Sequence, residues 1–267
     1  MPELDSKSEP GVDNRAAIQL AVDRCAAAGG GRVIVPQGTC VSGEILLKSH
    51  VCPYLESGAV LRASADPAAY PTRYRLFDLR AFISAVDAEC VTIADEGTLD
   101  GDCHAWVDHE GAYYLYKREK DRLPFLVQFV HCRHVVLRDI TIRNGPVWTV
   151  VPRGCDDVLI SGVSIYNDLL MLNSDAIDIV SCRDVRIVGC HIEAAEVTLR
   201  NCRVTFTDAA RESGEFRHVV AHDHAPGLRI EGLTGEAALP GLPPVAPMRI
   251  RAPAERDDGL AADTGGA

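Results

Sequence analysis

Several features that would assign this chain to a common class of protein are missing from it. No Cys-x-x-Cys pair occurs among its cysteines, so the sequence gives no sign of a zinc site of that kind. No apolar run approaches the ~20 residues of a membrane-spanning helix. Residues 1–11 are polar and acidic, whereas an export signal is basic and then apolar. We therefore expect no membrane segment and, for the chain as given, a cytoplasmic location.

Basic residues are also scarce. Lysine and arginine number 27 against 38 acidic residues, which gives a net charge of −11. This balance argues against nucleic acid and anionic membrane surfaces as partners, because both attract cations. It leaves an acidic substrate open, since salt confines the field of each charge to its neighbourhood and a local basic cluster can still bind a carboxylate.

An apolar pattern recurs at regular distances. It occupies residues 132–137, 155–160 and 182–187, with a shorter copy at 196–199, and it alternates as in strands with one buried face. A second apolar pair follows each copy: Ile140 and Ile142, Val163 and Ile165, Cys190 and Ile192, Cys202 and Val204. The interval is 23 residues from Val135 to Val158 and 27 from Val158 to Val185, which is long enough for one turn of a solenoid.

Residues 124–204 show neither closely spaced hairpin turns nor amphipathic helices between the strands. This argues against a sandwich and a doubly wound sheet. The repeat therefore predicts an all-β fold, a single-stranded right-handed parallel β-helix. The interval from Val185 to Val197 is only 12 residues, about half a turn. We expect part of a turn to be lost or rebuilt there, and a tightened corner in a regular solenoid is the alternative.

Ten cysteines could suggest disulfides, but their positions follow the repeat. Cys132, Cys155 and Cys182 recur at one position, and Cys190 and Cys202 share another. We expect stacked, buried thiols that act as small hydrophobic side chains.

The length allows one large solenoid domain, which we place at residues 1–252. A capping helix is expected at about 13–28, since Ile18, Val22 and Cys25 lie on one helical face and a run of glycines follows. This helix would cover the apolar end and the unpaired strand edges of the first turn. Polar and proline-rich sequence then predicts a loose tail at 253–267.

Residues 100–124 combine aromatic rings with cations. The segment holds Trp106, Tyr113, Tyr114 and Tyr116 beside Lys117, Arg118, Lys120 and Arg122. Aromatic rings stack on sugar faces and cations pair with carboxylates, so such a loop suits an acidic saccharide. A solvated loop with a few packed rings is an equal alternative.

Six segments, in this order, resemble a known family. They are Asp13-Asn14-Arg15-Ala16-Ala17-Ile18-Gln19, Gly29-Gly30-Gly31-Arg32-Val33, Gly43-Glu44-Ile45-Leu46-Leu47-Lys48-Ser49, Gly97-Thr98-Leu99-Asp100-Gly101, Asn144-Gly145-Pro146-Val147-Trp148 and Asn173-Ser174-Asp175-Ala176-Ile177-Asp178. Together they resemble the polygalacturonases of glycoside hydrolase family 28. The resemblance implies a right-handed parallel β-helix, inverting hydrolysis of α-1,4-galacturonan or related pectic chains, and no metal or other cofactor.

The resemblance also implies a partner and a place of action. The partner would be a pectic polysaccharide or oligogalacturonide, and family members are often secreted, although no export signal is visible in the chain as given. We expect the protein to be a monomer.

Inverting hydrolysis needs a protonated carboxyl for the leaving oxygen and a carboxylate that activates water. The family's Asn-Thr-Asp stretch is matched by Asn173-Ser174-Asp175, so the resemblance implies that Asp175 is a catalytic carboxyl and that Asn173 binds substrate. Trp148 is expected to line the site, with burial at a corner as the alternative. Gly227-Leu228-Arg229-Ile230-Glu231 resembles the family's Arg-Ile-Lys segment, with Glu231 in place of lysine, and adds Arg229 as a substrate-binding residue. An ordinary late turn of the solenoid is the alternative.

The sequence departs from the family after Ile192, where the Gly-Asp-Asp and Gly-His-Gly stretches are absent. Glu193 and Glu196 are the acidic residues nearest in sequence to the place of the missing acid pair. They could substitute for that pair, and the alternative is that both are exposed charges. Asp178 follows Asp175 by three residues, so alternation along a strand predicts the opposite face and a structural role. His222 and His224 would share one side of a strand, without a third ligand for a metal.

Three functions follow from these observations. The first is an inverting polygalacturonase-like glycosidase. The second is a catalytically impaired β-helix that binds pectic saccharide, because the Gly-Asp-Asp and Gly-His-Gly stretches are missing. The third is a pectate-lyase-type eliminase, which needs clustered acids for calcium and a basic residue to abstract a proton. The sequence shows no such cluster within one repeat, so we prefer the glycosidase.

Overall fold

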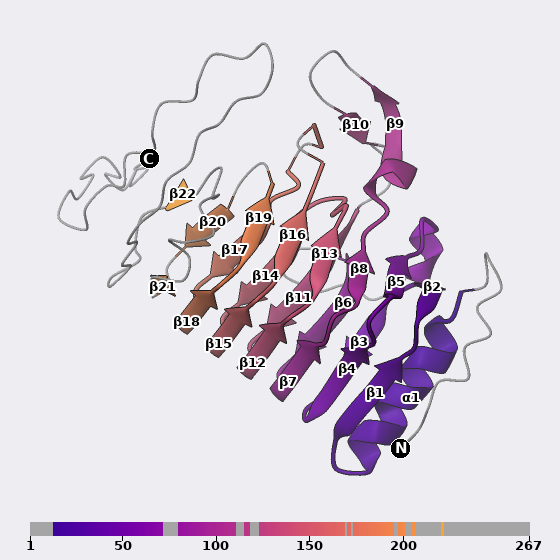
Figure 1. Ribbon diagram of the computed structural model, residues 1–267, viewed down its shortest axis with the longest axis vertical. Helices are drawn as coiled ribbons and strands as arrows, with labels where there is room; N and C mark the ends of the chain where they lie inside the picture. Colours follow the sequence, from indigo (N-terminus) through magenta and orange to yellow (C-terminus); the bar gives the residue numbers. More distant parts are fainter. Residues whose placement is uncertain are drawn as a thin grey trace, which may run out of the picture.

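The chain folds into stacked turns, each built from three short strands. The computed structural model describes residues 13–71, 80–110, 115–117, 123–168, 170–171, 173–194, 197–200, 204–206 and 220–221. Successive turns lie side by side from the N-terminal end onward (Figure 1), and the view from above shows the same stacking. The proposed tail at 253–267 lies outside the described residues.

Three parallel sheets run along the stack, and strands of successive turns are neighbours in each. Sheet A contains β1 (Gly31–Val35), β4 (Val51–Leu55), β7 (Glu89–Ala94), β12 (Arg133–Arg138), β15 (Asp156–Ser161), β18 (Arg183–Val188) and β21 (Val204–Phe206). Sheet B contains β2 (Gly38–Ser42), β5 (Ala59–Ala63), β8 (Thr98–Asp100), β13 (Thr141–Arg143), β16 (Ser164–Tyr166) and β19 (His191–Glu193). Sheet C contains β3 (Ile45–Leu47), β6 (Arg80–Val86), β11 (Pro124–Val130), β14 (Val150–Arg153), β17 (Ile177–Val180), β20 (Val197–Arg200) and β22 (Val220–Ala221).

The strand pairing confirms the right-handed parallel β-helix predicted from the repeat. Val135 lies opposite Val91 on one side and Val158 on the other, and Val158 lies opposite Val185. The second apolar residues stack in the same way in sheet B, where Ile165 lies between Ile142 and Ile192. An antiparallel pair, β9 (Val107–Glu110) and β10 (Leu115–Lys117), stands apart from the three sheets.

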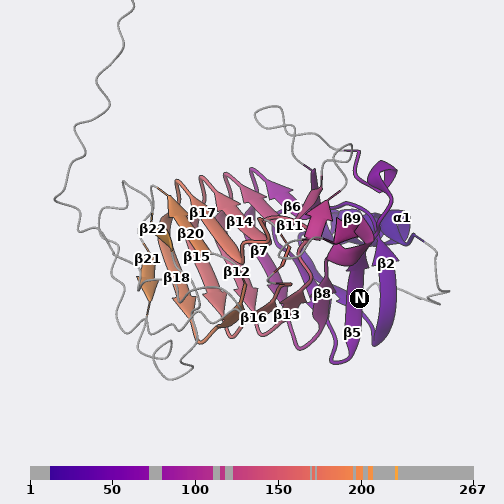
Figure 2. The same ribbon diagram turned by 90° about the horizontal axis from the view of Figure 1, so that it is seen from above.

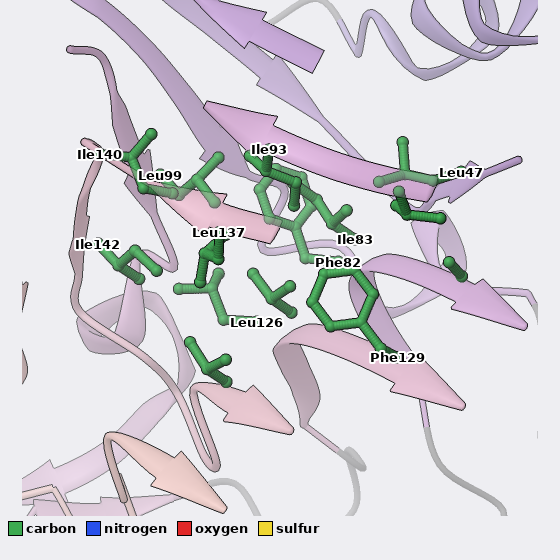
Figure 3. Close-up of a cluster of buried hydrophobic side chains, with 14 of the residues drawn as sticks. Leu47, Phe82, Ile83, Ile93, Leu99, Leu126, Phe129, Leu137, Ile140 and Ile142 are labelled. Atoms are coloured by element: carbon green, nitrogen blue, oxygen red, sulfur yellow. The ribbon is translucent and has the colours of Figure 1, made fainter. Parts of the chain in front are cut away.

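The hydrophobic core fills the space that the three sheets enclose. In Figure 3, Ile93 and Leu137 from sheet A, Leu99 and Ile142 from sheet B, and Phe82, Leu126 and Phe129 from sheet C point into this space. All of these side chains are buried. Because each inward position repeats on the next turn, the core is a set of continuous columns, and burial of these columns is the main source of stability.

The prediction of stacked, buried thiols is confirmed for the repeat cysteines that the structure describes. Cys132, Cys155 and Cys182 are 0%, 2% and 1% exposed, and Cys190 is buried as well. The thiol of Cys132 donates to Ala85 O at 3.4 Å, and Cys155 N donates to Cys182 Sγ at 3.3 Å. All the described cysteines are free thiols, and Cys202 lies outside the described residues.

The expected capping helix is present as α1 (Arg15–Ala27). It buries Ile18, Ala21, Val22 and Cys25 against the first turn, at the N-terminal end of the stack (Figure 1). The carboxylate of Asp13 accepts from Arg15 N at 2.9 Å and from Gly43 N at 2.9 Å, which anchors the helix start to the chain between β2 and β3. Among the described residues, no helix is both long enough and apolar enough to cross a membrane.

The grouping of residues 196–199 with the repeat is wrong. Val197 lies opposite Ile177 in sheet C, whereas the repeat strands belong to sheet A, where Val204 lies opposite Val185. The short interval from Val185 to Val197 therefore joins two different sheets, and the chain completes a further turn. The shortening lies in a connection: residues 194–196 link β19 to β20, while residues 167–176 link β16 to β17 on the turn before.

Native-state alkylation tests this core. The hydrogen bond with Cys155 and burial raise the pKa of the Cys132 thiol above its ordinary value, and the thiol has no path to solvent. We expect iodoacetamide at pH 8 to label the exposed Cys90 and to leave Cys132, Cys155 and Cys182 unlabelled, as measured by peptide mass spectrometry. In denaturant all four should react. Rapid native labelling of these three thiols would contradict the columnar core.

Candidate active site

Asp175 lies in the connection between β16 and β17, just before the latter strand begins at Ile177. It is 7% exposed. Asn173, two residues earlier, is exposed and adopts a left-handed backbone with φ of 52°. This conformation, which Asn tolerates better than most residues, turns the chain sharply before Asp175.

Trp148 is the register neighbour of Asp175 on the preceding turn. Val150 lies opposite Ile177, and Thr149 N donates to Asp175 O at 2.9 Å, so the parallel register continues back to Trp148 and Asp175. The half-buried indole of Trp148 stacks on Phe125, with ring centroids 5.1 Å apart and planes at 25°. These rings form an apolar cluster separate from the main core. The column of register neighbours that contains Phe125, Trp148 and Asp175 therefore lies on the outside of sheet C.

The structure differs from the expectation that Asp178 faces away from Asp175. Asp178 lies opposite Val151, since Val150 lies opposite Ile177, and Val151 packs in the same outer cluster as Trp148. The columns that contain Asp175 and Asp178 therefore share the outer face of sheet C. The alternation rule fails because Asp175 precedes β17 and belongs to a bend, where the strand's two-residue period does not hold. Asp178 is 2% exposed.

A buried amide joins the segments that carry Trp148 and Asp175. Asn167 Oδ1 accepts from Gly145 N at 3.0 Å, while Asn167 Nδ2 donates to Thr149 Oγ1 at 2.7 Å and to Ser174 O at 3.0 Å. Ser174 Oγ donates to Gly145 O at 2.8 Å. We call these four residues, Gly145, Thr149, Asn167 and Ser174, the Asn167 clamp. The sequence gives no sign of it, because a single Asn in a polar stretch is unremarkable.

The insert between β8 and β11 contacts the same connection, although not as the sequence suggests. Trp106 is 0% exposed and packs against Tyr70 at 6.3 Å, so in this structure its ring is not available to stack on a sugar. Cys103 and Met171 pack together, and His104 Nε2 lies 3.2 Å from Asp168 Oδ2. The insert therefore rests on the segment that leads to Asp175.

The remaining aromatic and basic residues of the insert are only partly described. Tyr116 and Lys117 belong to β10. The other positions singled out by the sequence lie outside the described residues: Tyr113, Tyr114, Arg118, Lys120 and Arg122.

Other candidate residues fall in different places. Glu193 lies on β19 in sheet B, where its Oε1 is 3.2 Å from His191 Nε2, so it belongs to a different sheet from the one that Asp175 precedes. Glu196, Arg229, His222 and His224 lie outside the described residues. The described residues contain no group of three or more His, Cys, Asp or Glu side chains placed to hold a metal ion.

The sequence of this chain matches a known protein family and individual known proteins. The model of glycosyl hydrolases family 28 matches residues 25–199. A probable polygalacturonase from Vitis vinifera is 28% identical over 199 residues, which cover 68% of this chain and 40% of that protein. An exopolygalacturonase from Platanus acerifolia is 24% identical over 182 residues, covering 64% of this chain and 44% of that protein. The chain thus spans about two-fifths of the length of these curated relatives.

Solved structures show the same fold. The hyperthermoactive exopolygalacturonase from Thermotoga maritima superposes with a TM-score of 0.65 at 22% identity, over 84% of this chain and 62% of that chain. The family 28 exopolygalacturonase from Yersinia enterocolitica gives a TM-score of 0.68 at 18% identity, over 84% of this chain and 50% of that chain. With the family model matching well over half of its residues, the chain belongs to glycosyl hydrolases family 28.

Proposed function

We propose that this chain is a polygalacturonase-type glycosidase that hydrolyses α-1,4-galacturonan or related pectic oligosaccharides with inversion. The observation that carries the proposal is the placement of Asp175 beside Trp148 on the outer face of sheet C. A carboxyl-bearing residue and an aromatic residue at neighbouring register positions suit a glycosidase, since a ring can pack on a sugar while a carboxyl acts at the glycosidic bond. The names of the relatives from Vitis and Platanus support the substrate class.

Inverting hydrolysis requires two carboxyls, roughly 6.5–9.5 Å apart, with water between one of them and the sugar. Asp175 is proposed as one of the two. Asp178 is the described carboxyl whose column shares the same face, so it is the candidate for the second role. Asn173, Trp148 and Arg229 are proposed to bind substrate, and the protein is proposed to act as a monomer without a cofactor.

One observation favours a second function, saccharide binding without turnover. The family's Gly-Asp-Asp pair is expected on the turn after Asp175, and there the chain has only the short connection 194–196 between β19 and β20. If no other carboxyl replaces that pair, the outer face of sheet C would still bind pectic saccharide but would not cleave it.

Replacing the proposed catalytic carboxyl separates these two functions. General acid or base catalysis contributes about 10²- to 10⁴-fold to rate, so we expect Asp175→Asn to lower reducing-sugar release from polygalacturonate by at least about 10²-fold. Asp139→Asn serves as the matched control, because Asp139 is half-exposed and pairs with Arg138, its neighbour along the chain. Binding of oligogalacturonate should persist in both variants. If the wild-type protein releases sugar no faster than Asp175→Asn while both bind, the glycosidase proposal fails and the binding function stands.

The chemistry of the product tests the reaction type. Hydrolysis adds water across the bond, so the products should be saturated and show no new ultraviolet absorbance. Inversion at an α-linkage should give the β-anomer first, which proton NMR detects before mutarotation. An unsaturated product that absorbs in the ultraviolet, and that disappears when calcium is chelated, would instead indicate elimination.

A further inference from the structure

The Asn167 clamp links the two segments that carry the proposed reacting groups. Thr149 directly follows Trp148, and Ser174 directly precedes Asp175. The amide of Asn167 donates to both, at 2.7 Å and 3.0 Å, and accepts from Gly145 N on its other side. This side chain adds a second set of links to the backbone bonds from Thr149 N to Asp175 O and from Val150 N to Ala176 O, which also join the two segments.

The Asn167 clamp is buried, and each polar group of the Asn167 amide has a hydrogen-bond partner within it. Asn167 is 7% exposed, and both Thr149 and Ser174 are 0% exposed. A primary amide offers two N–H donors and one carbonyl acceptor, and Asn167 uses both donors and the acceptor here. A buried donor that loses its acceptor is costly, so the network resists any shift of one segment relative to the other.

The equivalent positions of the neighbouring turns make different contacts. Asn144 N donates to Tyr166 O and Asn167 N donates to Glu193 O, so Asn144, Asn167 and Ala194 occupy equivalent positions on successive turns. Ala194 has no polar side chain, and the Asn144 amide donates to Asp100 Oδ1 at 2.9 Å instead. The bonds of Asn167 to Thr149 and Ser174 are thus specific to the turn that carries Asp175.

We infer that Asn167 is a positioning residue for the reaction: it holds Asp175 beside Trp148 so that carboxyl and ring meet the same stretch of bound glycan. This inference rests on the proposed function. Asn167 acts through Ser174 and Thr149 and does not itself touch the substrate. Its effect should appear in turnover more than in binding, because the orientation of a reacting group matters most at the transition state.

Asn167→Ala and Thr149→Val are the variants that test the inference. A displacement of about 1 Å at a reacting group can cost on the order of 10²-fold in rate. We expect each variant to lower kcat per folded molecule by roughly that factor, with KM for oligogalacturonate changed by less than about threefold. Thr149→Ser keeps the hydroxyl acceptor that Thr149→Val removes, so it should restore kcat to within a few-fold of wild type.

Thermal melting of each variant separates positioning from a purely structural role. A purely structural role would lower the melting temperature and leave kcat per folded molecule unchanged, and that result would overturn the inference. If Asn167→Ala does not fold, Thr149→Val and Ser174→Ala decide in the same way, since each removes one bond of the clamp.

The failures of the two proposals are distinguishable. Loss of activity in Asp175→Asn together with normal kcat in the clamp variants would overturn the role of Asn167 alone. Full activity in Asp175→Asn would overturn the proposed function and, with it, the positioning role. Loss of kcat in both sets, with rescue by Thr149→Ser, would support both.

Discussion

The parallel register between successive turns is the constraint on which the rest of the structure depends. Every inward residue of one turn must stack on an inward residue of the next, as Val91, Val135, Val158 and Val185 do. A shift of one residue in any strand would turn its apolar side chains out of the core. The register is therefore fixed by burial, and the three sheets run continuously through the described turns.

The connections between strands are free of this constraint, and there the turns differ. The link from sheet B to sheet C spans residues 101–123, then 144–149, then 167–176 and finally 194–196 on successive turns. The longest of these is the aromatic and basic insert, and the third carries Asp175. The core thus provides a rigid frame, while loops of unequal length place chemical groups at one edge of sheet C.

The family match and the missing acid pair concern neighbouring turns of the solenoid. Residues 25–199 match the family model, and they include Asp175 and the turns that support it. The short connection 194–196 falls where the next turn would add its acids to the same edge. Asp178 lies on the same turn as Asp175, and the columns that contain the two residues share the outer face of sheet C.

The sequence by itself determined the solenoid, because apolar residues at a repeating interval can be buried only by stacking. It also determined the capping helix and the buried cysteine column, and it pointed to Asp175 and Trp148 through family segments. It misplaced residues 196–199, since a short apolar strand carries no mark of the sheet it will join. Only the tertiary structure decided that Asp178 shares a face with Asp175 and that Trp106 is buried. Only the tertiary structure showed that Asn167 bridges two loops, because a side-chain hydrogen bond between turns depends on register and bend geometry, and neither leaves a local pattern in the chain.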